Sequence, residues 1–143
     1  MSIKQLTVFV ENKPGTLVTI TDTLAANNVN IRALSLAETQ DFGVLRMIVN
    51  DLEVASRTLS EQGFLIKTTE VIGVKIGDDP GKLTAALQVL KDAGINMEYL
   101  YAFMARTPRH AYVVIRVEDN DQAEAALEGA GFHLITEEDI NKL

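Results

Sequence analysis

The 143-residue sequence contains no cysteine and only two histidines, His110 and His133. Without cysteine the chain forms neither a disulfide nor a thiolate zinc site, and it has no thiol nucleophile. A metal site would need both histidines together with carboxylates, and the two histidines stand in unlike sequence contexts. The sequence therefore predicts no metal site. The absence of cysteine suits a reducing compartment.

Basic residues and long apolar runs are also scarce. Thirteen Lys and Arg oppose twenty Asp and Glu, a net charge of −7, and no basic block is dense enough to follow a phosphate backbone. No run approaches the roughly 18 apolar residues that a membrane span needs, and the N-terminal MSIKQLTVFV lacks a cleavage site after its apolar stretch. We expect a cytoplasmic protein with no nucleic-acid or membrane partner.

Motifs for catalysis and cofactors are missing as well. The sequence shows no nucleophile with a paired base, and no pair of carboxylates in separately tuned surroundings. The DND stretch at 119–121 lacks the glycine of a calcium loop, and GAG at 129–131 precedes an expected strand instead of opening a helix. We therefore predict no enzymatic activity and no cofactor.

What the sequence does contain is one turn written twice. ENKPGTL at 11–17 and GDDPGKL at 77–83 are 66 residues apart, and apolar positions after them match at the same offset. Farther along, Asp51 matches Asp119 and Gly63 matches Gly131 at an offset of 68, which a two-residue insertion explains. The chain is an internal duplication. We predict two domains, at residues 1–70 and 71–143.

Each half changes its hydrophobic period in the same order. LTVFV at 6–10 and VIGVKI at 71–76 read as strands, a helix follows each Pro-Gly turn, and a hairpin, a second helix and a last strand complete each half. This order predicts an α+β fold of two ferredoxin-like βαββαβ repeats, with antiparallel sheets and helices on one face. A half of about 65 residues is marginal alone. Both faces of 97–104 are bulky, so we expect another chain or the sister repeat to cover the second face.

A strand, then Asn/Asp-x-Pro-Gly, then a helix and an Asn-Ile-like start of the next strand resembles the ACT domain, the small-molecule regulatory module of amino-acid metabolism. NKPG with VNI carries the resemblance in the first repeat, and DDPG with INM carries it in the second. It covers essentially the whole chain as a tandem pair. The resemblance implies regulation by amino acids bound between paired domains, with the sheets joined side by side into one eight-stranded sheet. It also implies a homodimer, and an enzyme of amino-acid metabolism as partner.

The turn itself suits an amino acid. Free N–H groups at the start of a helix favour an anion, so those of Gly15, Thr16 and Leu17 are expected to take a carboxylate. Their counterparts in the second repeat are Gly81, Lys82 and Leu83. Acceptors must hold the ammonium group. Asn12 and Asp78 occupy the matching position, and only Asp78 brings a charge, so we expect the two sites to differ in affinity.

The candidate ligand-binding residues surround both turns and the start of the strand after each helix. They are Asn12, Lys13, Pro14, Gly15, Thr16, Leu17, Val29, Asn30 and Ile31 in the first repeat, and Asp78, Asp79, Pro80, Gly81, Lys82, Leu83, Ile95, Asn96 and Met97 in the second. The alternative is that Pro-Gly only makes a turn, which would leave a constitutive scaffold or interaction protein with the same fold and no ligand.

A basic hairpin tip is the remaining feature. ARTPRHAY at 105–112 puts Arg106, Arg109 and His110 on a loop of an otherwise acidic protein. These side chains could reach a ligand carboxylate, dock an acidic partner, or simply be solvated.

Overall fold

The computed structural model describes residues 2–38, 41–105 and 107–143. The chain forms two compact units: Lys4–Thr69 is one, and Glu70–Leu143 with the N-terminal residues through Ile3 is the other. Arg106 of the predicted hairpin tip lies outside the described residues. Among the described helices, none combines the length and the apolar character that crossing a membrane requires.

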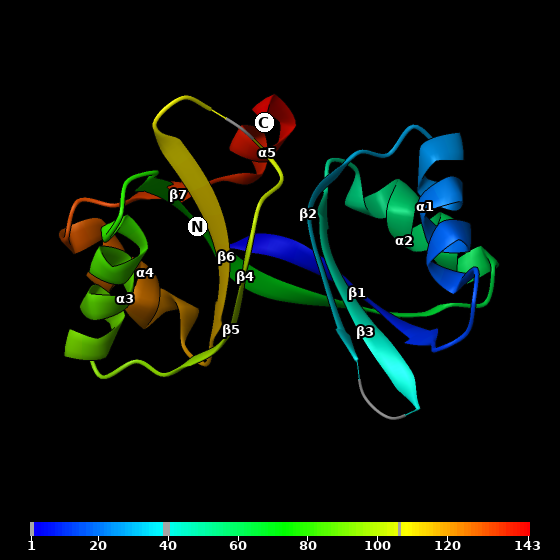
Figure 1. Ribbon diagram of the computed structural model, residues 1–143, viewed down its shortest axis with the longest axis horizontal. Helices are drawn as coiled ribbons and strands as arrows, with labels where there is room; N and C mark the ends of the chain where they lie inside the picture. Colours follow the sequence, from blue (N-terminus) through cyan, green and yellow to red (C-terminus); the bar gives the residue numbers. More distant parts are fainter. Residues whose placement is uncertain (1, 39–40, 106) are drawn as a thin grey trace. The chain divides into compact units, whose positions relative to one another are not determined.

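The first unit has the predicted βαββαβ order (Figure 1). Its elements are β1 (Ile3–Glu11), α1 (Thr16–Ala26), β2 (Ile31–Glu38), β3 (Phe42–Val49), α2 (Leu52–Glu61) and the first residues of β4 (Leu65–Gly77). The strands follow the order β2-β3-β1-β4, and β3 pairs antiparallel with both β1 and β2.

The second unit repeats this order and adds a terminal helix. Its elements are the rest of β4, α3 (Lys82–Asp92), β5 (Met97–Ala102), β6 (His110–Val117), α4 (Asn120–Gly129), β7 (His133–Ile135) and α5 (Glu137–Lys142). The strand order is β7-β4-β6-β5, and every neighbouring pair is antiparallel.

One detail of the predicted fold needs correction. The expected last strand of the first repeat and first strand of the second are a single strand, β4, which runs from Leu65 to Gly77. No glycine or proline interrupts 65–72, so nothing in this stretch forces the chain to turn. The described residues therefore contain seven strands where the sequence predicted eight.

The sheet register reproduces the duplication. In the first unit Phe9 pairs with Val44 and Glu11 with Phe42. In the second unit Lys75 pairs with Tyr112 and Gly77 with His110, at the same offsets of 66 and 68 that the sequence shows. Equivalent positions in the two repeats are thus equivalent in the backbone ladder.

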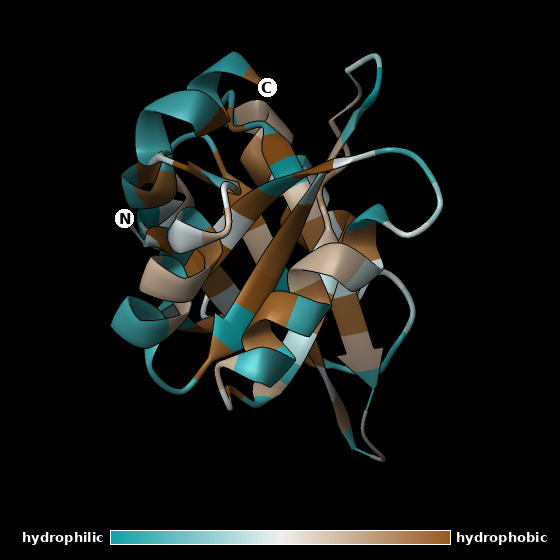
Figure 2. Ribbon diagram, turned by 90° about the vertical axis from the view of Figure 1, so that its left-hand side faces the viewer, coloured by the Kyte–Doolittle hydropathy of each residue, from teal (hydrophilic) through white to brown (hydrophobic). Residues whose placement is uncertain are grey.

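Each unit buries an apolar core between its helices and one face of its strands. Ile20 and Leu24 of α1 join Leu59 of α2 against β1 and β3, and Leu90 of α3 joins Leu127 of α4 against β4 and β6. In Figure 2 the strands carry much of the brown, and the outer turns of the helices carry teal. The predicted helices on one face are confirmed for each unit.

The ends of the helices follow ordinary capping chemistry. Asn28 and Gly94 adopt the left-handed conformation after α1 and α3, and Asp51 and Asp119 accept amide hydrogen bonds at the starts of α2 and α4. At α5 the Thr136 hydroxyl accepts from the Asp139 amide at 3.1 Å, and the Asp139 carboxylate accepts from the Thr136 amide at 3.0 Å. This reciprocal pair is a capping box.

We predict that Asp139→Ala lowers the free energy of unfolding by about 1 kcal/mol, because the helix loses half of its capping box. Thermal unfolding followed by circular dichroism measures the change. Asp139→Asn is the matched control, since its amide oxygen can still accept from Thr136, and it should lose less than the alanine variant.

The same contacts predict a pH dependence. The hydrogen bond from the Thr136 amide lowers the pKa of Asp139 most. Burial opposes it to a smaller extent, and the side chains of Thr136 and His133 lower the pKa further, so that it lies below its usual value. A lowered folded-state pKa stabilises the fold above the unfolded pKa of about 3.9, and this stability is lost as pH falls through the folded pKa. The difference in the free energy of unfolding between wild type and Asp139→Ala should therefore become smaller below pH 4. A gap of unchanged size at pH 2 would contradict the assignment.

Candidate ligand-binding site

The two Pro-Gly turns share one backbone conformation. Gly15 has φ 86° and ψ −10°, and Gly81 has φ 91° and ψ −10°, both in the left-handed region immediately before a helix. Apart from the adjacent residues, a Cβ at either position would meet no heavy atom within 4 Å. Glycine is therefore required by the backbone conformation and not by lack of space.

The helices that follow these turns start without a side-chain cap. α1 and α3 have no hydrogen bond from a capping side chain, whereas α2, α4 and α5 are capped by Asp51, Asp119 and Thr136. Helix-start amides and the helix dipole together favour an anion. The amides of Thr16 and Lys82, expected to be free, instead donate to the Lys13 carbonyl at 3.5 Å and the Asp79 carbonyl at 3.2 Å. The two helices without caps are the two for which the sequence predicts a ligand.

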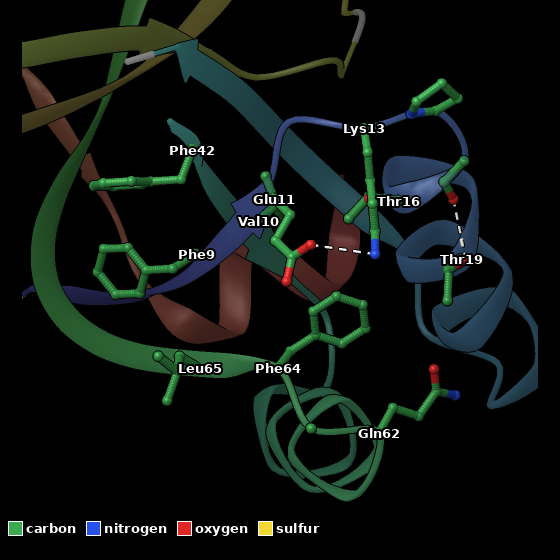
Figure 3. A pocket seen from close by; sticks show the side chains of 13 residues that line it. Phe9, Val10, Glu11, Lys13, Thr16, Thr19, Phe42, Gln62, Phe64 and Leu65 are labelled. Atoms are coloured by element: carbon green, nitrogen blue, oxygen red, sulfur yellow. Dashed lines mark hydrogen bonds and ion pairs between the residues drawn. The ribbon is translucent and has the colours of Figure 1, made fainter. Parts of the chain in front are cut away.

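A cavity of about 770 Å³ opens beside the first turn, within the first unit (Figure 3). It is lined by Phe9, Val10, Glu11, Lys13, Pro14, Gly15, Thr16, Thr19, Phe42, Gln62, Gly63, Phe64 and Leu65. These residues come from the end of β1, the start of α1, the start of β3 and the link from α2 to β4. The volume suits a small molecule.

One wall of this cavity is apolar and faces solvent. The Phe9 and Phe42 rings meet edge to face at a centroid distance of 6.5 Å. Phe9 is 38% exposed, Phe42 44% and Leu65 74%. Figure 3 shows the two rings beside Leu65. Exposed apolar side chains gathered in one place mark a binding surface more often than scattered ones do.

The charged part of the cavity is an ion pair. Lys13 Nζ lies 3.2 Å from Glu11 Oε2, and both side chains are largely exposed. An exposed pair of this kind contributes little to stability. It places an ammonium and a carboxylate next to an apolar wall, and these are the two charges that complement a zwitterion.

The pocket also contains a hydroxyl without a hydrogen-bond partner. Thr16 begins α1 and lines the cavity, and its Oγ1 is buried and unpaired. An unsatisfied buried hydroxyl usually has a functional or structural reason. The neighbouring Thr19 hydroxyl, by contrast, donates to the Gly15 carbonyl at 3.0 Å.

Asn12 and the start of β2 do not line this cavity. Asn12 Nδ2 donates to Glu38 Oε1 at 2.8 Å, and Asn30 exchanges hydrogen bonds with Asn50. Val29 is buried in the core, and Ile31 packs against it. The 11 residues of α1, about 16 Å of helix, separate Val29, Asn30 and Ile31 from the Pro-Gly turn. Within one repeat, these three residues and the turn therefore do not form a common site. Their role in binding stays a prediction, as does that of Leu17.

Several lining residues were missed by the sequence reasoning, above all Glu11, Phe9, Phe42, Phe64 and Leu65. Phe9 stands between Val8 and Val10, two core residues, so strand alternation places it on the other face. A bulky aromatic there was a usable signal. Phe64 was read as the end of a helix and the start of a strand, not as a binding residue.

The second repeat has its own cavity at the equivalent place, of about 480 Å³. It is lined by Lys75, Ile76, Gly77, Asp79, Lys82, Arg109, His110, Gly131, Phe132 and His133. Asp79 and Lys82 are thus predicted residues at the cavity. Asp78, Pro80 and Gly81 of the turn and Leu83 of α3 do not line it. The Asp78 amide donates to the Arg109 carbonyl at 3.0 Å.

Ile95, Asn96 and Met97 line a separate hollow of about 400 Å³ at the far end of α3, with Lys91 and Gly94. As in the first repeat, the helix separates them from the turn. In the described ranges, no three His, Asp or Glu side chains are grouped to hold a metal ion.

The fold and the paired turns define a tandem ACT regulatory domain, and comparison with known proteins agrees. The family of ACT domain pairs matches residues 1–143, and the chain belongs to this family. The structure of protein BT0572 from Bacteroides thetaiotaomicron is 37% identical, with a TM-score of 0.93 over 100% of this chain and 98% of that one. No curated protein matches the chain significantly.

More distant structures share the fold. The regulatory subunit of aspartate kinase from Thermus thermophilus, in its ligand-free form, has a TM-score of 0.66 at 17% identity, over 90% of this chain and 91% of that one. Aspartate kinase from Synechocystis has a TM-score of 0.58 at 20% identity, over 90% of this chain and 25% of that one. The chain therefore has the fold of ACT regulatory subunits.

We predict that Gly15→Ala lowers the free energy of unfolding by about 1 kcal/mol, because an L-residue is strained at a left-handed φ. Denaturant unfolding provides the measurement. Gly129→Ala is the control, since that glycine is helical and a Cβ there also meets nothing within 4 Å. Equal losses in the two variants would mean that the left-handed conformation is not the cause.

Proposed function

We propose that this protein is an amino-acid-binding regulatory protein with its amino acid at the Pro-Gly turn of the first repeat. In the first repeat the carboxylate lies at the start of α1 near Lys13, and the ammonium lies at Glu11. The side chain is apolar and packs on Phe9, Phe42 and Leu65. The observation that carries the proposal is the exposed apolar wall of a cavity that opens at a helix start with no side-chain cap.

The regulatory part of the proposal follows from the family. The fold is that of an aspartate kinase regulatory subunit, and a regulatory ligand must bind two states of the protein with different affinity. We propose that ligand binding changes the contact of this chain with a second copy or with an enzyme of amino-acid metabolism, and that the chain itself is not an enzyme. The family resemblance also predicts that a paired ACT domain covers each Pro-Gly turn, and this stays a prediction.

A thermal-shift screen of the full chain against the twenty amino acids tests the proposal. Ligand at about 100 times its Kd adds roughly 2.7 kcal/mol of stability. We expect large apolar amino acids to raise the Tm by several degrees, and aspartate and lysine to raise it least. Phenethylamine and 3-phenylpropionate each lack one of the two charges and serve as analogues. No shift with any amino acid at millimolar concentration would favour the scaffold alternative.

Substitutions at two adjacent positions locate the ammonium. Glu11→Gln should weaken binding of the best amino acid about tenfold, which corresponds to about 1.4 kcal/mol, because a charged partner of the ammonium is lost. Asn12→Ala should change the Kd little, since the Asn12 side chain is turned to Glu38. Isothermal titration calorimetry measures both. A larger loss in Asn12→Ala than in Glu11→Gln would move the ammonium to the position that the sequence motif suggested.

A further inference from the structure

The cavities of the two repeats are built on equivalent backbone positions but have different side chains. The register pairs Glu11 with Phe42 in the first repeat and Gly77 with His110 in the second, and each pair lines its cavity. The exchanged lining positions are Phe9 and Lys75, Glu11 and Gly77, Lys13 and Asp79, Thr16 and Lys82, Phe42 and His110, and Leu65 and His133.

These exchanges replace an apolar wall by a basic one. The second cavity has three permanent cations, Lys75, Lys82 and Arg109, against the single carboxylate of Asp79, and two imidazoles stand where the first cavity has Phe42 and Leu65. The chain as a whole carries a net charge of −7, so the basic lining runs against its overall composition. Cations held around a concave site raise the local concentration of anions.

The side chain of Lys82 occupies space that is free because Gly77 has no side chain. A Cβ on Gly77 would lie 2.8 Å from Lys82 Cγ, 3.1 Å from Cδ and 3.2 Å from Cε, so the lysine stem occupies the space that only glycine leaves. The first repeat has Glu11 and the short Thr16 at these two positions. Gly77 and Lys82 therefore belong together in the second repeat, and the alkyl chain of Lys82 lies beside the end of β4.

The hairpin that carries Arg109 is attached to the same turn. The Arg109 carbonyl accepts from the Asp78 amide at 3.0 Å, and Arg109 adopts a left-handed φ of 72° that is uncommon for a side-chain-bearing residue. On the opposite wall His133 Nε2 lies 3.4 Å from Asp139 Oδ2. Arg109 and His110 of the basic tip noted in the sequence thus line this cavity.

We propose that the cavity of the second repeat binds a small anion of at least two negative charges, carried by a phosphate group or by two carboxylates. Lys82, Lys75 and Arg109 supply the complementary charge, and their surplus of two positive charges over Asp79 matches an anion of two negative charges. The inference concerns the second cavity only. It does not rest on amino-acid binding in the first, and the two ligands are expected to bind independently at separate sites.

Titration of the ¹⁵N-labelled full chain with inorganic phosphate, against chloride at constant ionic strength, tests this proposal. We expect saturable shifts of the amides at 77–79, 81–84 and 109–111, and none of those at 11–13 and 15–18. A parallel titration with succinate distinguishes the two anion classes: tighter binding of one identifies the ligand group. Chloride shifting the same amides as strongly as both dianions would overturn the proposal, and so would phosphate shifts confined to the first turn.

Charge-matched variants give the second test. Lys82→Gln should weaken binding of the tighter dianion at least tenfold, whereas Lys91→Gln, on the same helix but outside this cavity, should change it less than twofold. An equal loss of affinity in the two variants would mean that only the net charge of the protein matters, and it would overturn the proposed site. Both lysines are exposed, so we expect both variants to fold.

Gly77→Ala tests the seating of Lys82 without changing any charge. The added methyl displaces the lysine stem, and we expect several-fold weaker binding of the dianion in the wild-type background and no further loss in Lys82→Gln. An equal loss in both backgrounds would contradict the seating role. Binding of the best amino acid to each variant should be unchanged. If no amino acid binds but phosphate or succinate does, the proposed function fails while this inference stands.

Discussion

The left-handed backbone at Gly15 and Gly81 is the constraint on which the rest of each repeat depends. It lets a strand end and a helix begin within four residues, so the helix packs back over the sheet, and a glycine at the N-cap leaves the first turn without a side-chain cap. The same geometry sets the cavity beside the turn, because the end of the strand and the start of the helix form two of its walls.

Duplication preserved this backbone while the lining side chains changed. The ladder offsets are identical in the two repeats, yet Phe9 and Leu65 of one cavity correspond to Lys75 and His133 of the other. Backbone hydrogen bonds tolerate such exchanges because a side chain at a cavity wall contributes little to the ladder or to the core. Two copies of one turn can therefore serve two ligand chemistries, as the proposals for the two cavities require.

Membership in the ACT domain pair family supplies the regulatory context. It does not identify the ligands, which depend on the residues of each cavity. The likeness to aspartate kinase regulatory subunits, at 17% identity, concerns the fold. What this chain binds is a matter of wall chemistry: an apolar surface with one ion pair in the first repeat, and a surplus of cations in the second.

The sequence by itself determined the duplication, the βαββαβ order, the left-handed ends of α1 and α3, and the caps of α2, α4 and α5, because these depend on local periodicity and turn chemistry. Tertiary structure alone decided which side chains share a cavity. Phe42, Phe64 and Glu11 are far apart in the chain, and only the strand register and the ends of the helices bring them together. The tertiary structure also turned the Asn12 side chain toward Glu38 and placed Asn30 one helix length from the Pro-Gly turn. A sequence motif does not determine where its side chains point.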